Sequence, residues 1–158
     1  MIKPITIYGN PVLRKECVSI EKTYPGIQEV IETMWQTLRN TDGCGLAAPQ
    51  INLPIKLFVV NSRDSYAYMS VRERERFFAK DDCGIEETFI NAEITGYSDE
   101  VWTTGEGCLS IPDLYEEVTR PWSISIRIRN LMSKSKFTTD ILHESSNMSL
   151  SIRKGNCI

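Results

Sequence analysis

Apolar residues recur at helical spacing over residues 25–40, a pattern that predicts one amphipathic helix. Pro25 suits a first helical turn, and Asp42-Gly43 supplies a stop signal. The apolar positions follow the series i, i+3, i+4, i+7, i+8 and i+11 at Ile27, Val30, Ile31, Met34, Trp35 and Leu38. We interpret this stripe as a core-facing surface and not as a ligand site.

Much of the remaining chain has the composition and alternation of β-strands. Ile124, Ile126 and Ile128 alternate with polar neighbours, as a half-buried strand requires. The expected strands cover residues 55–61, 87–94, 100–104, 115–119 and 123–128. Because these runs follow one another without crossover helices, we expect an α+β fold with antiparallel sheets, in a single domain over residues 1–158.

A charged segment, residues 63–83, interrupts this series and includes the run RERER. Charge runs usually form solvated faces. We therefore expect an exposed loop or short helix that elaborates the core.

The composition excludes several classes of protein. With a net charge of -3, the chain lacks the excess of basic residues that is typical of proteins that bind nucleic acid or an anionic membrane surface. We expect no membrane span and no leader, because no apolar run is long enough and the start, MIKPITIYGN, lacks the features of a signal peptide. Five irregularly spaced cysteines argue against a disulfide framework and favour a reducing cytoplasm.

Two short stretches carry the candidate chemistry, GCGLAAPQ at residues 43–50 and GEGCLSIP at residues 105–112. As a thiolate, Cys108 would be a metal ligand or a nucleophile, although an isolated cysteine is more often buried and structural. Glycines in both stretches let the backbone approach a ligand closely. Pro49 should hold Ala48 extended and so project Gln50 towards a site. We expect both stretches to form loops.

Together, GLAAPQ and EGCLS resemble the first two signature motifs of the peptide deformylases. TIYGNPVLRKEC and FINAEI extend the resemblance from the N-terminus to about Ile128. The resemblance implies a C-terminal metal-binding helix in addition to the antiparallel sheets and the N-terminal helix. It also implies a divalent metal bound by Cys108, usually Fe²⁺, with Ni²⁺ or Zn²⁺ able to substitute.

The same resemblance assigns roles around the metal. Gln50 and the backbone N–H of Leu109 would stabilise the oxyanion, and Gly45 and Gly107 would lie against the bound peptide. The implied reaction is metal-dependent hydrolysis of the formyl group of N-formylmethionine on nascent polypeptides, at the ribosome in the cytoplasm. Neither nucleic-acid sequence recognition nor a membrane is implied.

The family's third motif, HExxH on a helix, supplies two histidines one turn apart and a glutamate as general base. This chain has one histidine. By the resemblance, the sequence HESSN would make His143 the second metal ligand and Glu144 the general base, with Asn147 in place of the second histidine. An asparagine carbonyl suits a thiolate–imidazole site poorly. The alternative is therefore a catalytically impaired deformylase-like protein that binds peptide N-termini or has no activity.

The tail from about residue 130 is rich in Ser, Lys, Thr and Asn and lacks the apolar periodicity of a core helix. A reading-frame shift between residues 127 and 130 would explain this composition. In the shifted frame, each codon consists of the last base of one residue's codon and the first two bases of the next residue's codon. Codon choices that the genetic code permits for residues 139–157 then encode GYTTRIIQHEFEHKEGELY. That string resembles the third motif, GYxARxxQHExDHxxGxL, in register. On this hypothesis the match of His143-Glu144 is coincidental, and the metal-binding helix is missing.

Overall fold

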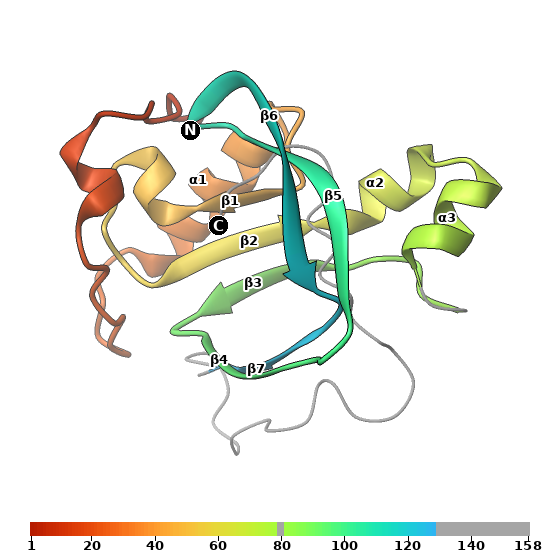
Figure 1. Cartoon of the computed structure of the whole chain (residues 1–158). Helices are drawn as coiled ribbons and strands as arrows, with labels where there is room; N and C mark the ends of the chain where they lie inside the picture. The colour runs from red at the N-terminus through yellow and green to blue at the C-terminus, as the bar shows by residue number, and fades with distance from the viewer. Residues whose placement is uncertain (79–80, 129–158) are drawn as a thin grey trace.

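The computed structural model describes residues 1–78 and 81–128 (Figure 1). It has an α+β fold with antiparallel sheets, as the sequence predicts. The C-terminal helix implied by the family lies outside the described residues. The elements are η1 (Pro11–Arg14), α1 (Ile27–Leu38), β1 (Gly45–Ala47), η2 (Ala48–Ile51), β2 (Leu57–Asn61), α2 (Ser62–Tyr68), α3 (Val71–Phe77), β3 (Glu86–Ile90), β4 (Glu93–Tyr97), β5 (Val101–Cys108), β6 (Ile111–Pro121) and β7 (Ile124–Arg127), where η denotes a 3₁₀ helix.

The predicted amphipathic helix is confirmed as α1, with a different start. Gly26 adopts a left-handed conformation, with φ of 68°, and caps the helix. Pro25 therefore precedes the helix and does not occupy its first turn. Met34 and Leu38 are buried, so the apolar stripe faces the core as predicted.

The core lies between α1 and the three-stranded antiparallel sheet, whose strand order is β1-β2-β3. Leu46 of β1 pairs with Val59 of β2, and both side chains are completely buried. The core residues are Ile20, Met34, Leu38, Leu46, Ala48, Ile51, Ile55, Leu57, Val59 and Ile90.

The single strand predicted over residues 87–94 is wrong, because the chain turns inside it. Asn91 has a positive φ of 50° and separates β3 from β4. Its side-chain amide accepts from the N–H of Ile20 and donates to the carbonyl of the same residue, both at 2.8 Å. These two hydrogen bonds hold the turn at which β3 ends. Beyond the turn, β4 pairs with β7.

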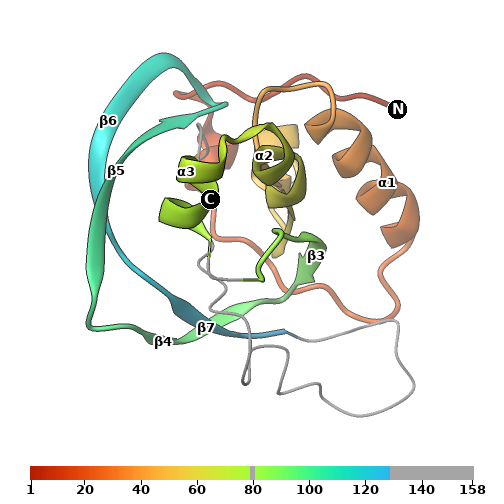
Figure 2. The same cartoon turned by 90° about the vertical axis from the view of Figure 1, so that its right-hand side faces the viewer.

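The strands after β3 form a curved arm beside the core (Figure 2). β5 and β6 make a long antiparallel hairpin, and β4 pairs with β7 at its base. In β7, Ser125 and Arg127 are exposed while Ile124 and Ile126 are half-buried, which confirms the predicted alternation. The arm leaves the tip of the hairpin beside β1 and η2 (Figure 1).

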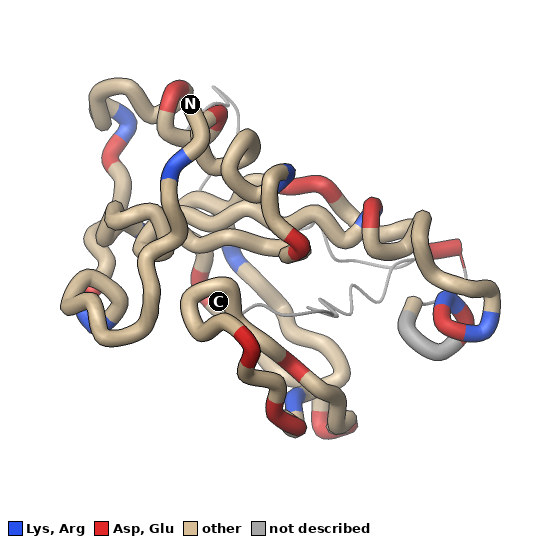
Figure 3. The backbone as a smooth tube through the Cα atoms, turned by 90° about the horizontal axis from the view of Figure 1, so that it is seen from above, with Lys and Arg blue, Asp and Glu red and all other residues tan. Residues whose placement is uncertain are grey.

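The charged insertion forms two short helices, α2 and α3, that project from the end of β2 (Figure 1). Basic and acidic residues lie side by side on α3 (Figure 3). Arg74 of α3 holds the two helices together, since its guanidinium donates to the carbonyls of Tyr66 and Ala67 in α2, each at 2.9 Å. The expectation of an exposed helical elaboration is therefore confirmed. Within the described ranges, no helix combines the length and apolar character that a bilayer span requires.

Candidate functional site

The tip of the β5–β6 hairpin carries the cysteine motif. Pairing continues to Cys108, which lies opposite Ile111, so that only Leu109 and Ser110 form the turn. The loop predicted over residues 105–112 is therefore wrong, because most of that stretch is paired strand. The register shifts between Gly107 and Cys108, an irregularity that re-aims the residues at the tip.

The glutamine motif also departs from the predicted loop. Residues 45–47 form β1, and Ala48 begins η2 instead of being extended before Pro49. A proline fits the first turn of such a helix because its missing N–H would have no partner there. The 3₁₀ turn buries Gln50, which has 4% exposure.

Gln50 joins the two motifs directly. Its Oε1 accepts from the N–H of Ala47 at 2.9 Å, and its Nε2 donates to Oγ of Ser110 at 3.2 Å. An amide NH₂ has two hydrogens, and these contacts use one of them. Ser110, the last residue of EGCLS, was missed by sequence reasoning, although its place in the motif was a readable signal.

The N-terminal segment makes backbone hydrogen bonds to both motifs. The N–H of Thr6 donates to the carbonyl of Gln50 at 2.7 Å, and the N–H of Tyr8 donates to the carbonyl of Ser110 at 2.7 Å. These bonds hold the hairpin tip against η2.

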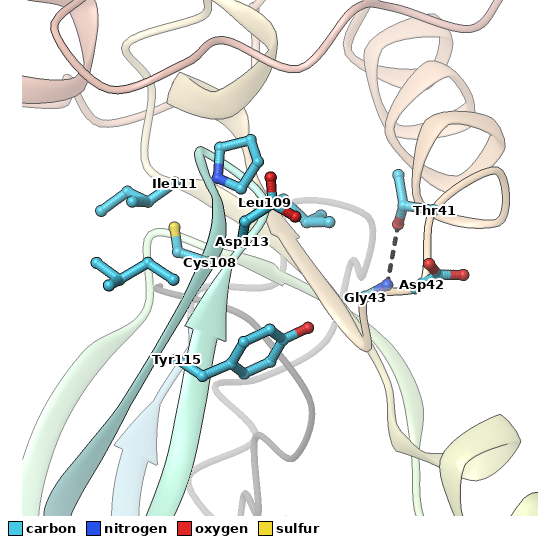
Figure 4. Close-up of a pocket in the computed structure, with 10 residues that line it drawn as sticks. Thr41, Asp42, Gly43, Cys108, Leu109, Ile111, Asp113 and Tyr115 are labelled. Atoms are coloured by element: carbon cyan, nitrogen blue, oxygen red, sulfur yellow. Dashed lines mark hydrogen bonds between the residues drawn. The ribbon is translucent and has the colours of Figure 1, made fainter.

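Cys108 is a half-buried free thiol that lines a cavity of about 520 Å³. Leu109 lines the same cavity, and residues 41–43 form its opposite wall (Figure 4). That wall is shaped locally, because the N–H of Gly43 donates to Oγ1 of Thr41 at 3.2 Å. Cys108 therefore borders a space that a small acyl group can enter.

The described residues do not complete a metal site. A catalytic zinc-type site needs about three protein ligands and one open position. Within residues 1–78 and 81–128, no group of three or more His, Cys, Asp or Glu side chains is placed to hold an ion. His143, Glu144 and Asn147 lie outside the described residues, so their roles stay predictions.

The two glycines predicted to contact the peptide occupy different strands. Gly45 is buried in β1 and Gly107 is buried in β5. A Cβ atom at Gly107 would lie 2.9 Å from the ring of Tyr115 and 3.1 Å from the carbonyl oxygen of Leu114. Close packing therefore explains this glycine, and contact with a peptide stays a prediction for both.

We expect Gly107→Ala to lower the free energy of unfolding by about 1–3 kcal/mol, because the methyl group must displace the Tyr115 ring or the backbone. Gly105→Ala is the matched control in the same strand, with nothing within 4 Å of the added Cβ. Urea unfolding of both variants measures the difference. Equal effects of the two substitutions would contradict this packing.

Comparisons with known proteins agree with the motifs. The sequence profile of the family described as polypeptide deformylase matches residues 2–142. The peptide deformylase of Flavobacterium psychrophilum is 44% identical over 126 residues, which cover 80% of this chain and 63% of the relative. That of Pseudothermotoga lettingae is 34% identical over 130 residues, which cover 82% and 64%. The chain thus spans about 63% of the length of these curated relatives.

Solved structures show the same fold. A Thermotoga maritima peptide deformylase has a TM-score of 0.65 and 28% identity, covering 83% of this chain and 76% of that one. An Arabidopsis thaliana peptide deformylase has a TM-score of 0.65 and 31% identity, covering 81% and 62%. The similarity includes the curved strand arm as well as the core, since it covers most of the chain.

Proposed function

Since the chain belongs to the polypeptide deformylase family, we propose that it carries the peptide-binding side and the thiolate ligand of a metal-dependent formyl-peptide hydrolase. The proposed substrate is the formyl group of N-formylmethionine on nascent polypeptides in the cytoplasm, met at the ribosome. One observation carries this proposal: the hydrogen bond from Gln50 to Ser110, which unites both motifs beside the Cys108 cavity.

Gln50 and Leu109 are the proposed oxyanion donors. Fixed N–H groups aimed at a developing negative charge need no reorganisation during reaction, which is the source of their effect. Gln50 is buried and held at Oε1 by Ala47, so its amide has a defined orientation. Leu109 presents its backbone from a turn that Ser110 anchors.

Cys108 is the proposed metal ligand. The family is metal-dependent, and a bound divalent ion supplies Lewis-acid polarisation and an activated water. We propose Fe²⁺, with Ni²⁺ or Zn²⁺ as substitutes. In the literal sequence, His143 would be the second ligand and Glu144 the general base.

A second candidate function rests on the histidine count. One histidine in the entire chain cannot supply the two imidazoles of an HExxH helix. A chain with intact peptide-binding motifs and an incomplete metal site would bind formylated peptide N-termini and hydrolyse them slowly or not at all. The frame-shift hypothesis predicts the same outcome.

Peptide binding tests the part of the proposal that both candidates share. We expect formyl-Met-Ala-Ser to shift the backbone amide resonances of Leu109 and Gly107, and to bind about tenfold more tightly than Met-Ala-Ser. The reason is that the formyl oxygen accepts from the proposed oxyanion donors. Equal affinity of the two peptides, or shifts confined to residues remote from the hairpin tip, would contradict it.

A further inference from the structure

Glu106 is a buried carboxylate that the proposed reaction does not use. It has 8% exposure, and both of its oxygens are bound by one guanidinium. Nε of Arg120 donates to Oε1 at 3.0 Å, and Nη2 donates to Oε2 at 2.8 Å. Such a two-bond fork fixes the relative orientation of its partners as well as their distance.

The ion pair runs along the hairpin and not straight across it. Glu106 lies opposite Glu116, whereas Arg120 lies opposite Trp102. The two partners are therefore separated by four residues of β6, about 13 Å of extended strand. Both side chains must stretch towards each other, and a bend of the hairpin towards that face shortens the gap.

That face of the hairpin looks towards the rest of the molecule. Thr104 lies between Trp102 and Glu106 on the same face, because side chains alternate along a strand. Thr104 lines a second cavity, of about 840 Å³, together with Asn61 and Tyr68 from the end of β2 and from α2. Figure 2 shows the hairpin curving around the side of the molecule that carries α2 and α3. The ion pair therefore spans the inner side of the curve.

The tip of the hairpin is fixed from two sides. Glu106 precedes Cys108 by two residues, across the register shift. In the turn itself, Ser110 is held by Gln50 and by Tyr8. Cys108 and Leu109 thus lie between one anchor on β6 and another on the core.

We propose that Arg120 is a positioning residue, which holds Glu106 and through it the curvature of the β5–β6 hairpin, so that the Cys108 thiol and the Leu109 N–H face Gln50. The catalytic meaning of this arrangement rests on the proposed function. The geometric part concerns the thiol alone and needs neither metal nor peptide.

The reactivity of Cys108 tests the proposal in the full chain with Cys17, Cys83 and Cys157 replaced by serine. Alkylation by iodoacetamide is followed by mass spectrometry at the two remaining cysteines. We expect Arg120→Gln and Glu106→Gln each to change the rate at which iodoacetamide alkylates Cys108 by roughly fivefold. The double variant should show no further change in this rate. Arg120→Lys keeps the positive charge but cannot form the two-bond fork. Its Cys108 alkylation rate should therefore lie between the rates of the chain with Arg120 and of Arg120→Gln.

Cys44 is the internal control, since it has 3% exposure and reports loss of the whole fold. A merely structural weakening would raise the Cys44 and Cys108 rates together, whereas the proposal requires a change at Cys108 alone. Arg127→Gln is the matched control for charge removal, because Arg127 reaches Glu93 at 3.9 Å between exposed side chains of β7 and β4.

An unchanged Cys108 rate in Arg120→Gln would overturn the proposal, as would additive effects in the double variant or an equal change in Arg127→Gln. If Arg120→Gln does not fold, Glu106→Gln decides, because it keeps the shape of the side chain. A selective change at Cys108 in a chain that binds no formyl peptide would sustain the positioning role and refute the proposed function.

Discussion

Insertion of one nucleotide between codons 127 and 130, to restore the proposed reading frame, raises the rate of formyl-Met-Ala-Ser hydrolysis by at least about a thousandfold over the chain as it stands. The restored tail supplies two imidazoles one helical turn apart and a glutamate between them. Together with Cys108 these make the three-ligand set that leaves a position open for water. The measurement is kcat/KM for both proteins, each loaded with Fe²⁺ or Ni²⁺ under the same conditions.

Two variants control this comparison. In the frame-restored protein, Cys108→Ser should abolish the gain, because it removes the thiolate ligand. If the frame has shifted, Glu144 has no catalytic role, and Glu144→Gln should leave the residual rate of the present chain unchanged. A high rate in the present chain that Glu144→Gln abolishes would show that HESSN is a working third motif and that no frame shift occurred.

Gln50→Leu should lower the free energy of unfolding by about 2–4 kcal/mol, because it leaves the buried Ser110 hydroxyl and the half-buried Ala47 N–H without their partner. The substitution keeps the approximate volume but removes the acceptor of the Ala47 N–H and the donor to Ser110. In the frame-restored protein it should also lower kcat by about 10²–10³-fold, as the loss of one oxyanion donor does.

Ser110→Ala separates the two roles of Gln50. It removes the link between the motifs and leaves the Gln50 amide in place, so we expect a loss of stability with a smaller loss of kcat. Gln36→Leu is the surface control, because the Gln36 amide bonds to the exposed Glu32. Equal destabilisation by Gln50→Leu and Gln36→Leu, measured by urea unfolding, would contradict the structural role of Gln50.

Local patterns were sufficient to predict α1 and the alternating strand β7. Their periods of about 3.6 and 2 residues follow from the backbone geometry itself. The helices of the insertion could also have been placed more sharply. Ser70 and Glu73 form a capping box that the sequence displays, with the Ser70 N–H donating to Glu73 at 2.8 Å.

Contacts between distant residues could not be predicted from such patterns. The break at Asn91 depends on Ile20, which is 71 positions away. The link from Gln50 to Ser110 spans 60 positions. In both cases the sequence near each residue suits several conformations, and the partner brought by the fold selects one. The bidentate pair of Glu106 and Arg120 depends likewise on the pairing register of the hairpin.

Metal content tests the central claim most directly: that this chain holds the peptide-binding motifs and a single thiolate ligand of a deformylase without a complete metal site. Elemental analysis of the purified chain, after incubation with Fe²⁺, Ni²⁺ or Zn²⁺ and removal of excess ion, gives the metal bound per chain. We predict a content well below one ion per chain, because one thiolate with at most one imidazole holds a divalent ion weakly. One ion per chain, lost on Cys108→Ser, would contradict the claim.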